Sequence, residues 1–326
     1  MLPRYALAAI AMCLPSCDAF GATDDGADVT DTFGAPVVLA SGEITPRGVA
    51  VDDREVFWAS EDGGEIRATT KTGGQGVRLV ARAHRGGPRD IALDYSTVYW
   101  TETHGDCCSA GILRAPKAGG ADRPASLLGS SLGQVARRMS LQDRTIYATV
   151  QTYTDGESAV SVAADGSASP LFLARGEPTA LGAIVTTGPF VFWAAAAGTK
   201  IVRVEKPDGA QFDFATKQAG VEDMVTDGSV IYWGTNGGAL WSLTADRPGQ
   251  PPTQLASGLS APQRLVLQGE HLYFLQADGG IARVPKAGGA PQRLATLAGA
   301  RALAVDATGV FVTTDPGDVF KIPRSP

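Results

Sequence analysis

Two histidines and a glutamate, which lie close together in the sequence, could perform acid–base or metal chemistry. They are His84, Glu102 and His104. Imidazole and carboxylate groups are common general acids and bases, and both bind divalent metals. The chain has only 3 histidines, and it has neither a His-Glu-x-x-His motif nor a phosphate-binding loop. The sequence therefore predicts no catalytic residue, metal or other cofactor, and keeps these three side chains as candidates for ligand binding.

Cys107 and Cys108 are adjacent in the sequence and form a second candidate site. They could form a vicinal disulfide, an intermolecular bridge or a thiol metal site. Zinc ligands are usually spaced by two to four residues, which disfavours the metal. An exported protein meets oxidising conditions, and a vicinal disulfide needs no other partner. The sequence favours that bridge.

Four arginines share one position in a repeated unit, four residues before the last apolar residue of a predicted strand. They are Arg47, Arg89, Arg137 and Arg301. If the repeats are neighbours in space, these guanidinium groups form an arc that could bind a carboxylate or phosphate. Alternatively, each arginine pairs with a carbonyl or acid of a neighbouring repeat. The sequence leaves both interpretations open.

The elements that hold these residues are short strands repeated seven times. Each repeat contains a β-branched or aromatic triplet, and the seven triplets end at Trp58, Trp100, Ala148, Trp193, Trp233, Phe274 and Val312. A period near 40 residues, with Gly-rich turns between strands, is typical of β-propeller blades. We therefore expect an all-β, seven-bladed propeller over residues 37–326, with six or eight blades as alternatives.

The seventh repeat ends without a fourth strand, whereas an unassigned strand occurs at 36–42. We expect this N-terminal strand to complete the last blade and close the ring, which removes open sheet edges. The first strand of each repeat would line the central channel. The arginines then belong to blades 7, 1, 2 and 3, and the long loops 81–88, 101–111 and 149–158 form a rim above blades 1–3.

The N-terminus has the pattern of an export signal. Arg4 is followed by ten apolar residues, too few to span a bilayer. The sequence Leu14-Pro15-Ser16-Cys17 then resembles a bacterial lipobox, which implies a signal peptide at 1–16 and acylation of Cys17. Residues 17–36 are rich in Asp and Gly, without Lys or Arg, so we expect a flexible acidic tether.

The strand Tyr99-Trp100-Thr101-Glu102 resembles the YWTD propellers of lipoprotein receptors, although those usually have six blades. The whole repeat is similar to NHL and streptogramin-lyase-like propellers. Val98-Tyr99-Trp100 and the segment 283–289, Arg-Val-Pro-Lys-Ala-Gly-Gly, resemble repeats of uncharacterised bacterial lipoprotein propellers. The lyase resemblance implies His and Glu with a divalent metal at the channel mouth, but no predicted innermost strand here carries a histidine.

Composition narrows the function class. The net charge is −6, which argues against a protein that binds nucleic acid or an anionic membrane surface. We therefore expect the chain to contact a membrane only through its lipid anchor. We expect a monomeric lipoprotein of the bacterial cell envelope, on its periplasmic or extracellular face. The propeller would act as a binding or scaffolding module for a protein or a small acidic ligand, and not as an enzyme. A metal-dependent lyase or lactonase and a purely structural envelope protein are the alternatives.

The arginine arc gives a first testable prediction. Replacing Arg89 and Arg137 by Ala should weaken the binding of an acidic ligand strongly and leave the fold intact, because the guanidinium groups would hold the anion. Ligand titration and thermal unfolding of the same variant measure the two effects. A collapse of thermal stability would instead identify the arginines as contacts between blades.

Overall fold

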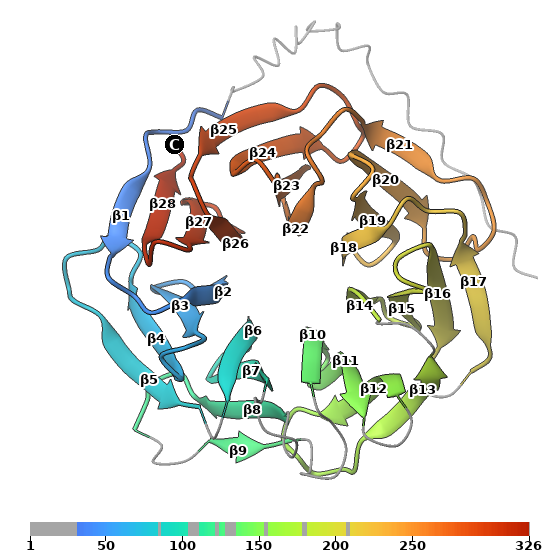
Figure 1. Ribbon diagram of the computed structural model, residues 1–326, viewed down its shortest axis with the longest axis horizontal. Helices are drawn as coiled ribbons and strands as arrows, with labels where there is room; N and C mark the ends of the chain where they lie inside the picture. The colour runs from blue at the N-terminus through green and yellow to red at the C-terminus, as the bar shows by residue number, and fades with distance from the viewer. Residues whose placement is uncertain are drawn as a thin grey trace, which may run out of the picture. The chain divides into compact units, whose positions relative to one another are not determined.

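The computed structural model describes residues 31–325 apart from 84–85, 104–110, 121–123, 128–134, 153–155, 178–180 and 207–208. In this part of the chain all regular elements are strands, arranged as seven blades in a ring (Figure 1). The predicted all-β, seven-bladed propeller is confirmed. No helix in the described residues is long and apolar enough to cross a membrane.

The first three blades follow one another along the chain. Blade 1 contains β2 (Pro46–Val51), β3 (Glu55–Ser60), β4 (Glu65–Thr70) and β5 (Arg78–Arg82). Blade 2 contains β6 (Gly87–Leu93), β7 (Thr97–Thr103), β8 (Gly111–Pro116) and β9 (Ala125–Ser126). Blade 3 contains β10 (Val135–Gln142), β11 (Thr145–Thr152), β12 (Gly156–Ala163) and β13 (Leu171–Glu177).

The remaining blades repeat this order. Blade 4 contains β14 (Ile184–Thr186), β15 (Phe190–Ala195), β16 (Lys200–Glu205) and β17 (Gln211–Ala215). Blade 5 contains β18 (Val221–Thr226), β19 (Val230–Thr235), β20 (Ala239–Thr244) and β21 (Thr253–Ala256). Blade 6 contains β22 (Gln263–Gln268), β23 (His271–Leu275), β24 (Gly280–Pro285) and β25 (Gln292–Thr296). Blade 7 contains β26 (Ala300–Asp306), β27 (Gly309–Thr314), β28 (Val319–Pro323) and β1 (Val37–Ala40).

In the described residues the hydrophobic core consists of seven clusters, one between each pair of neighbouring blades. Adjacent residues of a strand point to opposite faces, so two neighbouring residues of each second strand serve two interfaces. Both residues are aromatic in blades 1, 2, 4, 5 and 6. In blade 1, Phe57 packs with Trp100 of blade 2, whereas Trp58 packs with Phe311 of blade 7. Both residues are fully buried. The repeated triplet therefore holds the ring together.

The N-terminal strand closes the ring as predicted. β1 pairs antiparallel with β28, with Val37 opposite Lys321, and lies at the outer edge of blade 7 (Figure 1). The pairing continues upstream, because Phe33 forms a bridge with Arg324. The Phe33 ring also meets Tyr273 of blade 6 edge-on, with 6.4 Å between ring centroids. Closure thus involves residues before the predicted strand 36–42 as well as β1 itself.

Aspartates at the turn after the inner strand join neighbouring blades through lysines. Asp52 Oδ1 accepts the backbone N–H groups of Arg54 and Glu55, each at 2.9 Å, and its Oδ2 accepts Lys117 Nζ of blade 2 at 2.7 Å. Lys117 opens the Lys-Ala-Gly-Gly turn of its repeat. Asp52 thus caps backbone N–H groups of its own turn, and the Lys-Ala-Gly-Gly turn supplies a bond to the preceding blade.

A second Asp–Lys pair of this kind joins blade 7 to blade 1, where the ring closes. Asp306 of blade 7 accepts Lys71 Nζ of blade 1 at 2.7 Å, as well as the N–H of Thr308. Burial by itself would raise the pKa of Asp306, but the hydrogen bonds from Lys71 and Thr308 outweigh it and hold that pKa below its usual value. The carboxylate therefore stabilises the folded state at neutral pH.

This pair gives a stability prediction. Asp306→Asn should lower the free energy of unfolding at pH 7 by about 1–3 kcal/mol, the usual value for hydrogen bonds to charged groups. Because folding lowers the pKa of Asp306, its contribution is present above about pH 4 and is lost as the pH falls through the folded-state pKa. The difference from wild type should therefore shrink near pH 2.5, as measured by urea unfolding.

Asp213→Asn is the matched control, because Asp213 pairs with Lys200 within blade 4 at an exposed site. Such a pair contributes about 0–1 kcal/mol. An effect of Asp306→Asn no larger than that of the control would contradict the assigned role of the Asp306–Lys71 pair.

Candidate functional site

The inner strands surround a channel hollow of about 630 Å³. A second hollow of about 390 Å³ lies at the channel end where the inner strands begin. Asp90, Arg138, Ala183 and Arg264 line both hollows. The two spaces therefore adjoin, and together they form a cavity of the size used for small ligands.

β-bulges near the start of the inner strands shape this mouth. Six inner strands shift register there, for example β6 between Pro88 and Ile91 and β22 between Gln263 and Val266. A bulge sets two residues opposite one and changes where the side chains point. Consecutive residues such as Arg89 and Asp90 consequently both line the mouth hollow.

One repeat position forms a ring around the channel, and we call its residues the channel ring. From blade 1 to blade 7 they are Gly48, Asp90, Arg138, Ala183, Asp223, Arg264 and Ala302. An acid followed by a base occurs in blades 2 and 3 and again in blades 5 and 6. Small residues occupy the other three blades. The ring therefore carries two groups of each charge.

Backbone hydrogen bonds fix both channel-ring carboxylates. Asp90 Oδ2 accepts the N–H of Met139 in blade 3 at 3.0 Å, and Asp223 Oδ2 accepts the N–H of Leu265 in blade 6 at 2.9 Å. Each aspartate thus reaches the blade that follows. Burial raises the pKa of both, against the opposing charge of Arg138, and the charge of Asp90 raises the pKa of Asp223 further.

The two channel-ring arginines, unlike the aspartates, are not held by short hydrogen bonds in the described residues. Arg138 and Arg264 are half-buried, and within the described part of the chain no hydrogen bond or ion pair shorter than 4 Å holds either guanidinium group. Arg264 has a φ of +54°, a left-handed conformation that costs a non-glycine residue about 1 kcal/mol or more. The sequence thus keeps a strained arginine where glycine would fit the backbone better.

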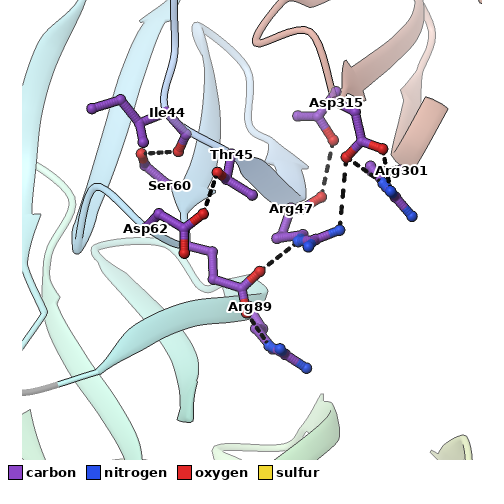
Figure 2. Close-up of polar contacts among 10 residues, drawn as sticks. Ile44, Thr45, Arg47, Ser60, Asp62, Arg89, Arg301 and Asp315 are labelled. Atoms are coloured by element: carbon purple, nitrogen blue, oxygen red, sulfur yellow. Dashed lines mark hydrogen bonds and ion pairs between the residues drawn. The ribbon is translucent and has the colours of Figure 1, made fainter. Parts of the chain in front are cut away.

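Three of the four predicted arginines take part in a chain of ion pairs across blades 2, 1 and 7. Arg89 and Arg47 donate from Nε to the two carboxylate oxygens of Glu61, the latter at 2.5 Å. Arg47 also lies 3.8 Å from Asp315, which accepts a fork of two bonds from Arg301. Figure 2 shows this row of alternating charges. Arg47, Arg89 and Arg301 therefore form ion pairs with acidic side chains. Anion binding by these arginines stays a prediction.

Of the other residues that the sequence analysis proposed, the structure describes the side chain of Glu102 only. Glu102 is only 1% exposed and accepts the indole N–H of Trp100 at 3.0 Å, so its carboxylate lies inside and not on the rim surface. Arg137 lies in β10, but its side chain is outside the described residues. His84, His104, Cys107, Cys108 and Cys17 are also outside the described residues, and their assigned roles stay predictions.

The predicted rim loop 149–158 is shorter than expected. β11 continues to Thr152 and β12 begins at Gly156, so the two strands pair almost to their ends, with Thr152 opposite Gly156. The predicted triplet that ends at Ala148 lies within β11, and the strand continues for four more residues. Blade 3 therefore has longer strands and a shorter connection than its sequence suggested.

Sequence reasoning missed Arg138 and Arg264 because it stopped one residue earlier in the repeat. The sequence does contain the signal, since Asp90, Arg138, Asp223 and Arg264 each stand directly before the apolar part of an inner strand. Ionisable residues at the start of an otherwise apolar inner strand indicate side chains that point into the channel. In the described residues, no group of three or more His, Cys, Asp or Glu side chains could hold a metal ion.

No protein-family model matches the sequence, and no curated protein matches it significantly. Solved structures do match its fold. Virginiamycin B lyase from Staphylococcus aureus is 13% identical, with a TM-score of 0.70 over 89% of this chain and 99% of that chain. The WD40 propeller of Doa1 is 16% identical, with a TM-score of 0.71 over 89% and 96%. A chain of a nidogen/laminin complex is 20% identical, with a TM-score of 0.55 over 72% and 89%. These similarities show a β-propeller fold.

The backbone of Arg264 gives a prediction that separates stability from binding. Arg264→Gly should leave the free energy of unfolding within about 0.5 kcal/mol of wild type or raise it, because glycine adopts positive φ without strain. Ala302→Gly, at the same ring position without positive φ, should lower it by about 0.5–1 kcal/mol. Denaturant unfolding measures both. A loss above about 1 kcal/mol in Arg264→Gly would assign the guanidinium a structural role.

Proposed function

We propose that this chain is an exported bacterial lipoprotein whose propeller binds a small anionic ligand at the channel mouth without transforming it. The observation that carries the proposal is the pair Arg138 and Arg264, two half-buried guanidinium groups that line both hollows. A guanidinium group removed from bulk water is stabilised by an opposite charge. A carboxylate or phosphate would supply that charge with the fork geometry that arginine prefers.

The ion-pair chain supports the same site from its outer side. Arg47 and Arg89 also line the mouth hollow, and Glu61 holds both of them by Nε. A guanidinium group has five N–H donors, so a contact through Nε still allows the group to bind a ligand. The Arg89 side chain is 51% exposed. We therefore expect Arg47 and Arg89 to attract an anion toward Arg138 and Arg264.

The propeller neighbours support a binding role only in general terms. The nidogen/laminin structure is a complex of proteins, and virginiamycin B lyase is an enzyme. Many activities occur on this fold. We favour a small anion over a protein partner because Arg138 and Arg264 line hollows of the channel, where they face a ligand that enters it.

Anion titration tests the proposal. The full-length mature chain should bind citrate or inorganic phosphate by isothermal titration calorimetry at low ionic strength. Arg138→Gln and Arg264→Gln should each weaken binding about 10–100-fold, because charge-assisted hydrogen bonds contribute about 1.5–3 kcal/mol. Arg144→Gln is the control, since the Arg144 side chain is 85% exposed on the turn between β10 and β11. Equal losses in all three variants would indicate unspecific attraction, and no binding of either anion would contradict the proposal.

The lipid anchor is tested separately. In bacterial cells, Cys17→Ser should move the chain from the membrane fraction to the soluble fraction, because acyl groups on Cys17 would supply the membrane attachment. Incorporation of radiolabelled palmitate should disappear in the same variant. Cys13→Ser, within the signal segment, should change neither result. Retention of Cys17→Ser in the membrane fraction would contradict acylation at this residue.

A further inference from the structure

We infer that the ligand is a small zwitterion of the amino-acid class, with its acid group on Arg138 and Arg264 and its ammonium group on Asp90 and Asp223. This inference rests on the proposed function and specifies the chemical class of the ligand. It starts from the composition of the channel ring, in which the two arginines are accompanied by two carboxylates.

The charge balance of the channel ring favours an acid group that is accompanied by an ammonium group. An anion seated on Arg138 also approaches Asp90, since the charge of Arg138 acts on both Asp90 and Asp223. Repulsion from these carboxylates reduces the gain from the arginines, and the reduction is large where the surroundings exclude water. A ligand that carries an ammonium group as well converts this repulsion into attraction.

The aspartates are held in place to receive such a group. Backbone N–H groups from the next blade bind Oδ2 of each carboxylate, and Asp223 Oδ1 also accepts the N–H of Met224 at 3.0 Å. An ionised carboxylate has about four acceptor sites, so it can accept from an ammonium group in addition to the backbone. Because the carboxylates are already oriented, binding costs little side-chain entropy.

The channel also has room for the rest of a small molecule. Beyond the ring, its lining includes the apolar side chains of Leu141, Val185, Val225 and Val266. The volume of about 630 Å³ lies in the range of ordinary small-ligand sites. An amino acid can therefore place its charged end on the ring and its side chain against these residues.

Matched ligand pairs test the inference by calorimetry on the full-length mature chain. The probes are L-glutamate against glutarate, and L-phenylalanine against 3-phenylpropionate, because each pair differs by the ammonium group. At least one amino acid should bind 10-fold or more tightly than its partner. If the partners bind equally or more tightly than the amino acids, the inference is overturned while the anion site stands. If none of the four binds although citrate or phosphate does, the inference is likewise overturned.

Asp223→Asn provides the residue-level test. It should remove most of the preference for the amino acid and leave the affinity for the acid-only partner unchanged or higher, since the amide cannot attract an ammonium group by charge. An unchanged preference in a folded Asp223→Asn protein would overturn the inference. If this variant does not fold, Asp90→Asn and the wild-type ligand comparison decide the question, because the latter requires no substitution.

Discussion

The structure depends on the alternation of side chains along the second strand of each blade. Two neighbouring residues point to opposite faces, so Phe57 joins blade 1 to blade 2 while Trp58 joins it to blade 7. No blade has a core of its own, and every cluster is shared between two blades. Stability is consequently a property of the ring. The inner strands do not carry the largest aromatic residues, and this leaves them free to place charged groups in the channel.

Aspartate side chains bind the next blade at two places, the turns after the inner strands and the channel ring. At the turns, Asp52 and Asp306 bind backbone N–H groups and a lysine of the next blade, so both charges are satisfied internally. In the channel, Asp90 and Asp223 also bind the next blade. Among the described residues no hydrogen bond or ion pair shorter than 4 Å holds Arg138 or Arg264, although the charge of Arg138 acts on both aspartates. A structural contact between blades therefore also fixes the carboxylates of the candidate site. This is why we assign the central part in ligand binding to Arg138 and Arg264, which no short contact holds, and not to Arg47, Arg89 and Arg301.

The sequence predicts the fold well because each blade is marked by the same short apolar and aromatic triplet. The triplets ending in Trp58, Trp100 and Trp193, together with the orphan strand at 36–42, are sufficient for the blades and their closure. The ion-pair partners Glu61 and Asp315 could not be predicted, since they lie in loops whose sequences differ from blade to blade. The channel ring was accessible from the aligned strands, but its orientation depends on the bulges, which place consecutive residues at the mouth. No short sequence pattern reports that geometry.

Closure by β1 has a consequence for the order in which the protein can fold. β1 leaves the ribosome before every other described strand, yet its partner β28 is the last to be synthesised. The complete blade 7 therefore cannot form until β28 has been synthesised. Pairing the two ends also brings together residues separated by almost the whole chain, which carries the largest loop entropy and a high contact order. The blades made before β28 thus form an open array, and the ring closes only when β1 and β28 pair.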